Sequence, residues 1–120
     1  MPRVVIPVTD FVRAGVAPPS QTNADSVNNH YIATNAGNVV IEVVSSDAGP
    51  QTVTIVSNPA LSVDGLTLGN LTVNVSAGAT VWCGPFNPRS YKQPSDSNRL
   101  YINASVSTNL KFRAYRMNAA

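Results

Sequence analysis

Short runs of alternating apolar and polar residues, separated by turn-forming residues, dominate this sequence. The clearest alternation covers residues 71–75, and Ala77-Gly78 interrupts it before a second apolar run at 79–83. Successive side chains of a β-strand point to opposite faces of the sheet, so a period of two predicts a strand with one buried face. Glycine permits a tight reversal, and Pro85 cannot donate a ladder hydrogen bond. We therefore predict a β-hairpin within residues 71–86.

Five further runs have strand character, and turn-forming residues lie between them. They cover residues 30–34, 39–44, 51–57, 99–104 and 110–117. The run at 39–44 is almost continuously apolar, as expected of a central strand that is covered on both faces. Val53 and Ile55 are predicted to point inward, whereas residues 58–70 are interpreted as irregular. Because no helical pattern of convincing length appears, the chain is predicted to be an all-β sandwich or barrel.

Residues 1–29 differ in character from the rest of the chain. Pro7 restricts any strand here to a sheet edge, and the thirteen residues at 17–29 are mostly turn formers. Such long loops are uncommon within compact domains and are usually functional or disordered. We expect an extended N-terminal arm over 1–29 and a β-sandwich domain over 30–120. The arm is either a frayed terminus or a segment that docks on a neighbouring subunit. Its apolar anchors would be Val4, Ile6 and Phe11.

The charge distribution narrows the classes of partner. Only 12% of the 120 residues are charged, and the net charge is +2. Residues 1–65 contain two basic and five acidic residues, whereas residues 66–120 contain six basic residues and one acidic residue. A chain with oppositely charged halves can bind its own copies or an acidic surface. We expect no direct contact with nucleic acid, because phosphate-binding proteins usually have denser basic patches with aromatic platforms.

The sequence contains few residues with catalytic potential. Cys83 is the only cysteine and His30 the only histidine, so no intrachain disulfide, thiolate zinc site or cysteine–histidine dyad can form. The six carboxylates are dispersed, and no glycine-rich phosphate loop occurs. We expect no enzymatic activity, no cofactor and no metal. His30 is interpreted as a structural histidine, and Cys83 as a small core residue.

The hydropathy pattern also bears on location. No apolar run approaches the ~20 residues that a membrane-spanning helix needs, so no membrane partner is expected. The first residues lack the apolar region of a signal peptide. We therefore expect the chain to be made and folded in a reducing compartment.

Two sets of side chains are candidates for a binding surface. Lys111, Arg113 and Tyr115 share one face of the last predicted strand, which is either a partner surface or the solvated side of an edge strand. A group of aromatic residues could stack on sugar rings, although core packing explains Trp82 and Tyr101 at least as well. The aromatic group consists of Trp82, Tyr91, Tyr101 and Tyr115.

Several segments together resemble a known family. They are VIPVTDFVRAGV at 5–16, the segment from Ala24 to Val43, VNVSAGATVWCGPF at 73–86 and RLYINASVSTNLKFRAYRM at 99–117. The pattern is similar to that of the small auxiliary head proteins of tailed bacteriophages, often called decoration or cement proteins. Asn28-Asn29 precedes His30 where the family-like form often has Asn-Gly, so we expect a different turn there. The family-like turn motif consists of Gly78, Gly84, Pro85 and Phe86.

This resemblance implies both a fold and a role. It implies a single jelly-roll-like β-sandwich that binds the outer face of the assembled capsid, commonly as a homotrimer, and clamps neighbouring capsomers. The partners would be the major capsid protein and other copies of the chain. The protein would be located on the outer surface of the virion after synthesis in the cytoplasm of the host bacterium. The candidate contacts with the capsid or a neighbouring subunit are Val4, Ile6, Phe11, Arg13, Lys111, Arg113 and Tyr115.

Two alternative functions fit the same sequence. One is a head–tail connector or tail component, which is also a phage structural protein but has a ring-sized copy number. The other is a carbohydrate-binding β-sandwich module. The latter would need an exposed row of aromatic side chains with polar groups beside it.

Overall fold

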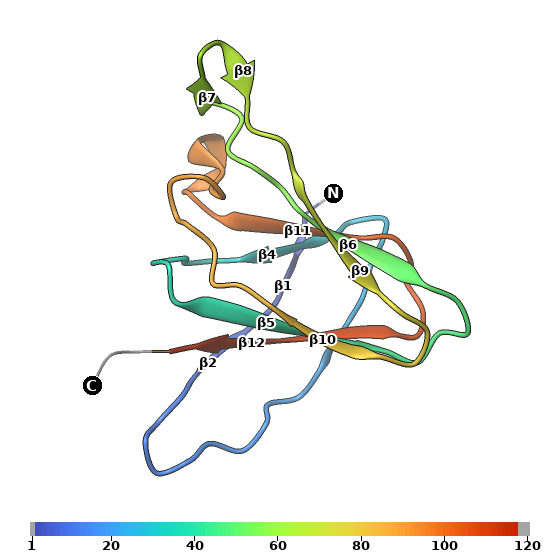
Figure 1. Cartoon of the computed structure of the whole chain (residues 1–120). Coiled ribbons are helices and arrows are strands. Elements are labelled where there is room, and N and C mark those ends of the chain that lie inside the picture. The colour runs from blue at the N-terminus through green and yellow to red at the C-terminus, as the bar shows by residue number, and fades with distance from the viewer. Residues whose placement is uncertain (1, 118–120) are drawn as a thin grey trace.

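The protein is an all-β sandwich, as the alternating runs predict (Figure 1). The computed structural model describes residues 2–117, apart from the side chains of Val63 and Thr67. Two mixed sheets pack against each other, and a short 3-10 helix, η1 (Pro94–Asp96), lies in a loop. Within residues 2–117 there is no helix long and apolar enough to cross a membrane.

Each sheet contains five strands that come from distant parts of the sequence. The first sheet has the order β1 (Val4–Val5), β4 (His30–Ile32), β11 (Leu100–Ala104), β6 (Gln51–Ile55) and β9 (Leu71–Val75). The second has the order β10 (Thr80–Cys83), β5 (Val39–Ser45), β12 (Leu110–Arg116) and β2 (Val8–Asp10), with β3 (Thr22–Asn23) also paired with β12. A small hairpin of β7 (Ser62–Val63) and β8 (Leu66–Thr67) projects from the sandwich.

The core lies between the two sheets and follows the predicted alternation. Val53 and Ile55 of β6 are fully buried, as expected, and so is Phe112 of β12. The central strand β5 is buried along most of its length. Full burial of an apolar side chain of this size contributes about 1.5–3 kcal/mol, so these strands supply much of the stabilising free energy.

The predicted hairpin at 71–86 is wrong, because its two strands belong to different sheets. β9 pairs with β6, and β10 pairs with β5. The turn itself forms where expected: the Ala79 amide donates to the Ser76 carbonyl at 3.0 Å, and Gly78 has a φ of 69°. Two consecutive strands with apolar faces can bury these faces in either of two ways: as neighbours in one sheet, or as members of two sheets that face each other. Here β9 pairs with β6 and β10 pairs with β5, and these pairings place the two strands in different sheets.

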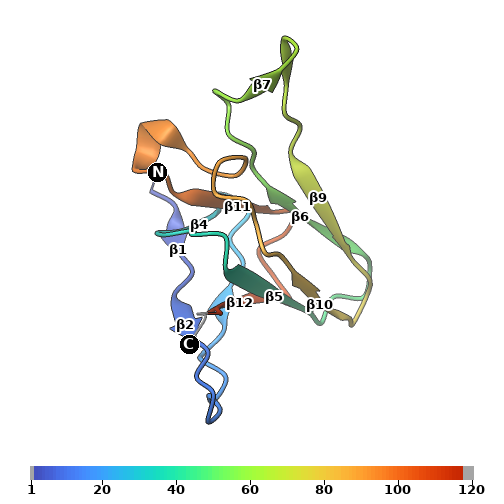
Figure 2. The ribbon, with the colours of Figure 1, turned by 60° about the vertical axis from the view of Figure 1, so that its left-hand side comes forward.

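The N-terminal stretch is extended, but it pairs with its own domain rather than projecting from it. β1 runs parallel to β4, and β2 runs parallel to β12. The link at Ile6-Pro7 crosses from the first sheet to the second (Figure 2). Ile6 is 1% exposed and belongs to the core, so the expected docking of this side chain on a neighbouring subunit is wrong. Pro7 lies between the strands, where its missing N–H is tolerated.

Asn29 forms the turn that leads from the N-terminal stretch into β4. Its φ is 60°, a left-handed conformation that glycine adopts easily and that asparagine tolerates better than most residues. Its carbonyl accepts from the Val4 amide at 2.8 Å, and its side chain accepts from the Ala104 amide at 3.0 Å. Asparagine thus provides this turn without a glycine and also ties it to β1 and β11.

We predict that Ile6→Ala lowers the free energy of unfolding by about 2–4 kcal/mol, because it leaves a cavity in the core. The matched control is Val5→Ala, since Val5 is the adjacent residue but is 43% exposed. That change should cost less than about 1 kcal/mol. Chemical denaturation of both variants measures the difference. Equal, small losses for the two variants would mean that residues 1–10 are not part of the core.

Candidate interaction surface

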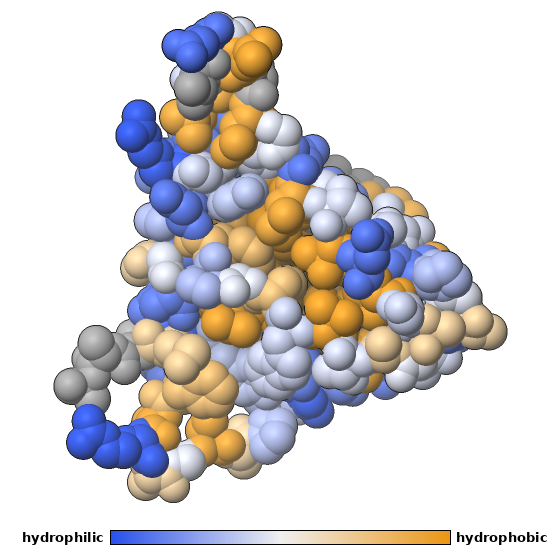
Figure 3. Space-filling view, viewed as in Figure 1, coloured by the Kyte–Doolittle hydropathy of each residue, from blue (hydrophilic) through white to orange (hydrophobic). Residues whose placement is uncertain are grey.

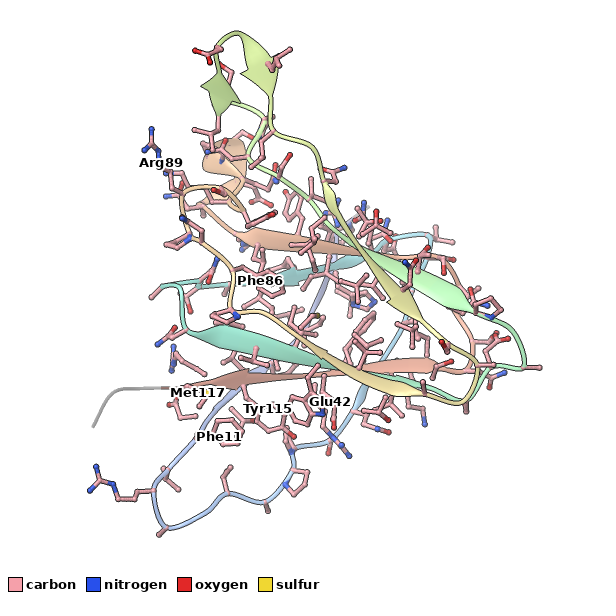
Figure 4. All side chains as sticks on the ribbon, viewed as in Figure 1. Phe11, Glu42, Phe86, Arg89, Tyr115 and Met117 are labelled. Carbon is pink, nitrogen blue, oxygen red and sulfur yellow. The ribbon has the colours of Figure 1, made fainter. Side chains whose placement is uncertain are left out.

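Three aromatic rings stack on the outer face of the second sheet. The ring centroids of Phe11 and Tyr115 are 4.9 Å apart with an interplanar angle of 5°, and those of Trp82 and Tyr115 are 5.3 Å apart at 27°. Tyr115 is only 4% exposed, whereas Trp82 is 51% exposed. We call these three residues the aromatic stack; Figure 4 labels Phe11 and Tyr115 beside each other at β12.

Strand register explains how the stack forms. Trp82 is opposite Glu42 of β5, and Glu42 is opposite Arg113 of β12, so Trp82 approaches Tyr115 from the β5 side. Phe11 follows β2 on the other side of β12, and its amide donates to the Arg116 carbonyl at 2.9 Å. Tyr115 therefore lies between the other two rings, and both of its faces are covered.

One ion pair and one hydrogen bond to the backbone hold the loop at 11–21 against this face. Arg113 contacts Glu42 at 2.8 Å through Nη1, and its Nε donates to the Pro19 carbonyl at 2.9 Å. Arg116 pairs with Asp10 at 2.6 Å. Glu42 is largely buried, and a partly buried charge needs its partner more than an exposed one does. The loop is thus fixed at both ends by side chains of β12.

Exposed apolar side chains surround the stack. Val12 and Met117 are both more than half exposed, and Met117 follows Tyr115 by two residues on the same face of the chain. Apolar side chains gather over loop 11–21 and the C-terminal end of β12 (Figure 3), where Figure 4 places Phe11, Tyr115 and Met117. We call Phe11, Val12, Trp82, Tyr115 and Met117 the stack patch. Exposed apolar side chains that gather on one part of a surface often mark an interaction site.

The predicted charged face of β12 is divided in the structure. Lys111 is exposed, Arg113 is engaged with Glu42 and Pro19, and Tyr115 is buried in the stack. β12 has strand neighbours on both sides, so the interpretation of this face as the solvated side of an edge strand is wrong. The alternative interpretation of Trp82 as a core residue is also wrong, because half of its surface is exposed. Adjacent residues of one strand alternate faces, but the sequence does not show which outer residues a loop will cover.

The remaining N-terminal candidates lie in different environments. Val4 is half-buried in β1, and Arg13 is exposed in the loop beside the stack patch. Of the seven candidate contacts, the structure brings together Phe11, Arg13, Arg113 and Tyr115 around loop 11–21 and β12.

The family-like turn motif is structural. Gly84 has a φ of 115°, and a Cβ atom placed there would lie 2.7 Å from the Val39 carbonyl oxygen, so only glycine fits. Pro85 is exposed, whereas Phe86 is 2% exposed and packs edge-on against Tyr91 at 6.0 Å. These residues direct the chain out of β10 and cover the core from the side.

The outer face of the first sheet carries a separate arginine–tyrosine cluster, which the sequence pattern did not predict. Arg3 lies 3.8 Å above the Tyr101 ring, and Arg99 lies 4.2 Å above the Tyr31 ring. Tyr31 and Tyr101 are opposite each other in register. The Tyr101 hydroxyl donates to Asp96, and this hydrogen bond raises the pKa of Tyr101. The cations of this cluster are engaged by rings and carboxylate within the chain.

The interpretation of residues 58–70 as irregular is wrong at β7 and β8, which form a hairpin around the turn signal Asp64-Gly65. Asp64-Gly65 occupies the turn, and both residues have positive φ values, 52° and 79°, as type I′ hairpin turns require. Its base is anchored by Ser57, whose amide and hydroxyl both contact the Asn70 side chain, at 2.9 and 3.1 Å. Leu66 near the tip is exposed.

The two potentially reactive side chains are buried or partly buried. The Nε2 atom of His30 accepts from the Asp25 amide at 2.9 Å, and the ring packs edge-on against Phe112. Burial raises the pKa of the Cys83 thiol to about 11, so the thiol is protonated at neutral pH. No group of three or more histidine, cysteine, aspartate or glutamate side chains that could hold a metal occurs in the described part of the chain.

Comparison with known proteins gives no match: no family model, no curated protein and no solved structure is significantly similar to this chain.

We predict that stability falls as the pH drops below about 6.5, because burial lowers the pKa of His30 from its ordinary value of 6.5. A lowered pKa means that the unfolded state binds the proton more readily than the folded state does. The contribution of neutral His30 to stability is therefore complete above pH 6.5 and is lost as the pH falls toward the lower folded-state pKa. Protonation would also remove the acceptor of the Asp25 amide. Melting temperatures between pH 8 and pH 5 measure the effect.

The control for this prediction is His30→Gln, which lacks a group that titrates in this range. Its melting temperature should change less between pH 6.5 and pH 5 than that of the wild type, whatever its absolute stability. Equal slopes in the two proteins would mean that another group controls this pH range.

Proposed function

We propose that this chain is a capsid decoration protein of a tailed bacteriophage, which binds the outer surface of the assembled head and stabilises contacts between capsomers. The stack patch is the observation that carries the proposal on the structural side. The resemblance of the sequence segments to phage auxiliary head proteins supplies the class of partner.

The composition of the stack patch supports a protein partner. Aromatic residues, methionine and arginine are enriched at protein interfaces, and all three occur here, with Arg113 and Arg116 beside the apolar residues. Phe11 and Trp82 are held in place by stacking on Tyr115 before any partner binds. Pre-organised side chains lose little conformational entropy on binding, which favours affinity.

The shape of the molecule also supports attachment to a large surface. Loop 11–21 and the β7–β8 hairpin project at opposite ends of the same side of the sandwich (Figure 1). Exposed Val12 lies in the loop, and exposed Leu66 lies near the hairpin tip. Two separated apolar projections can contact neighbouring capsomers, and repeated weak contacts on a symmetric shell add up through avidity.

We predict that Trp82→Ala weakens binding to phage heads prepared without this protein by about thirtyfold, as expected for the loss of an aromatic anchor. The matched control is Thr80→Ala, because Thr80 is exposed on the same face of β10. Its affinity should stay within about threefold of the wild type. Head occupancy is measured by co-sedimentation over a range of protein concentrations. Equal affinities for the two variants would exclude the stack patch from the interface.

The copy number on purified virions tests the broader proposal. Quantitative mass spectrometry against the major capsid protein should give one copy per capsid subunit or a simple fraction of it. A ring-sized count would instead indicate a head–tail connector or tail component, and absence from the particle would exclude both structural functions.

Carbohydrate binding is the second candidate, and the exposed Trp82 beside Glu42 and Arg113 specifically favours it. Aromatic platforms for sugars present ring faces, however, and both faces of Tyr115 are covered by its neighbours. Only the outer faces of Trp82 and Phe11 are available, and they point away from each other. The stack therefore suits a protein surface better than a row of sugar rings.

A glycan screen with the isolated protein separates the two candidates. Binding that is lost in Trp82→Ala, together with unchanged head occupancy of the same variant, would favour the carbohydrate-binding function. No glycan binding, together with reduced head occupancy, would favour decoration.

A further inference from the structure

The two lateral sides of the sandwich differ in how their strand edges are protected. On the N-terminal side, the edge strands β1 and β2 contain only two and three residues, and Pro7 lies between them. On the opposite side, the edge strands β9 and β10 contain five and four residues. Natural proteins protect sheet edges with short strands, charges or proline, because an unprotected edge pairs with another strand.

The β9–β10 side has none of these protective features within its strands. From Gly65 to Pro88 the sequence contains no charged residue, and neither β9 nor β10 contains proline. β9 is the last strand of its sheet and pairs only with β6. Within residues 2–117, no backbone hydrogen bond beyond that ladder involves residues 71–75. The outward backbone groups of β9 are therefore free to pair.

The core-facing side chains of β9 are incompletely covered. Val75 is fully buried, Val73 is partly buried, and Leu71 is 38% exposed. The coverage falls in this order because β10 diverges from β9 with distance from the Ser76–Ala79 turn (Figure 1). Figure 3 shows the resulting apolar surface between these two strands. An additional strand beside β9 would cover it.

The side chains of β9 are complementary to those of a second β9 that runs antiparallel to it. Leu71-Thr72-Val73-Asn74-Val75 alternates symmetrically about Val73. In a two-fold pair centred on Val73, Leu71 is opposite the partner's Val75 and Thr72 is opposite the partner's Asn74. Apolar residues thus meet apolar residues on one face, and hydrogen-bonding residues meet on the other.

We propose that β9 pairs with β9 of a second copy of this chain, so that the two first sheets join across a two-fold axis. A second copy is the occupant that the sequence of β9 favours, because its side chains match across the two-fold axis and no charge on the edge repels an identical edge. A two-fold contact closes at two copies. It therefore differs from the homotrimer that the family resemblance implies, and it does not depend on the capsid proposal.

The full-length protein tests this inference by its molar mass in solution. Light scattering after size-exclusion chromatography should give twice the 12.6 kDa of one chain at micromolar concentrations. The double variant Thr72→Lys/Asn74→Lys places lysines opposite each other at two points of the interface. Both side chains are exposed on the outer face, so the sandwich should stay folded. Dimerisation should weaken about tenfold or more.

Two further proteins complete the experiment. Thr80→Lys, on the exposed face of β10, should leave the dimer unchanged. A mixture of Thr72→Lys/Asn74→Lys with Thr72→Asp/Asn74→Asp should restore a dimer that contains one chain of each, because opposite charges then face each other across the axis. A monomer at all concentrations, a trimeric mass, or a dimer that Thr72→Lys/Asn74→Lys does not weaken would each overturn the proposal.

Discussion

The fold depends on the enclosure of one apolar core between two sheets, and the chain secures this enclosure by crossing between them at both sides. Ile6 lies at one crossing and is itself buried, whereas the Ser76–Ala79 turn makes the other. Each crossing ties an edge of one sheet to an edge of the other. The sheets therefore cannot separate without exposing core residues, and the free energy of burial opposes their separation.

β12 connects this core with the surface. Phe112 on its inner face packs in the core. On its outer face, Arg113 donates a hydrogen bond to the Pro19 carbonyl and Tyr115 stacks on Phe11, so both residues bind loop 11–21. A loop rich in turn formers has little core of its own, and its position depends on these contacts. The stack patch is thus built on a rigid strand, which is the arrangement that favours a pre-organised binding surface.

The stack patch and the edge of β9 are different surfaces that belong to different sheets. One is an apolar area on the outer face of the second sheet, and the other is an uncharged strand edge of the first. Contact of one surface with a capsid and of the other with a second copy would use different parts of the molecule.

The sequence by itself determined the all-β class and the inward residues of the long strands. Alternation in 51–55 identified Val53 and Ile55 as inward, because the period of two follows directly from strand geometry. The Asp64-Gly65 dipeptide also contains the turn signal of the projecting hairpin. These features depend on local backbone chemistry, which neighbouring residues encode.

Only the tertiary structure decided which strands are neighbours and which outer residues are covered. The run at 71–83 had the pattern of a hairpin, yet β9 and β10 joined opposite sheets because each pairs with a central strand from elsewhere in the chain. Ile6 is buried in the core, and Tyr115 on the outer face is covered by Phe11 and Trp82. Both outcomes depend on contacts with distant parts of the chain. Alternation specifies the two faces of a strand, but its partners depend on long-range packing, and no local pattern encodes that choice.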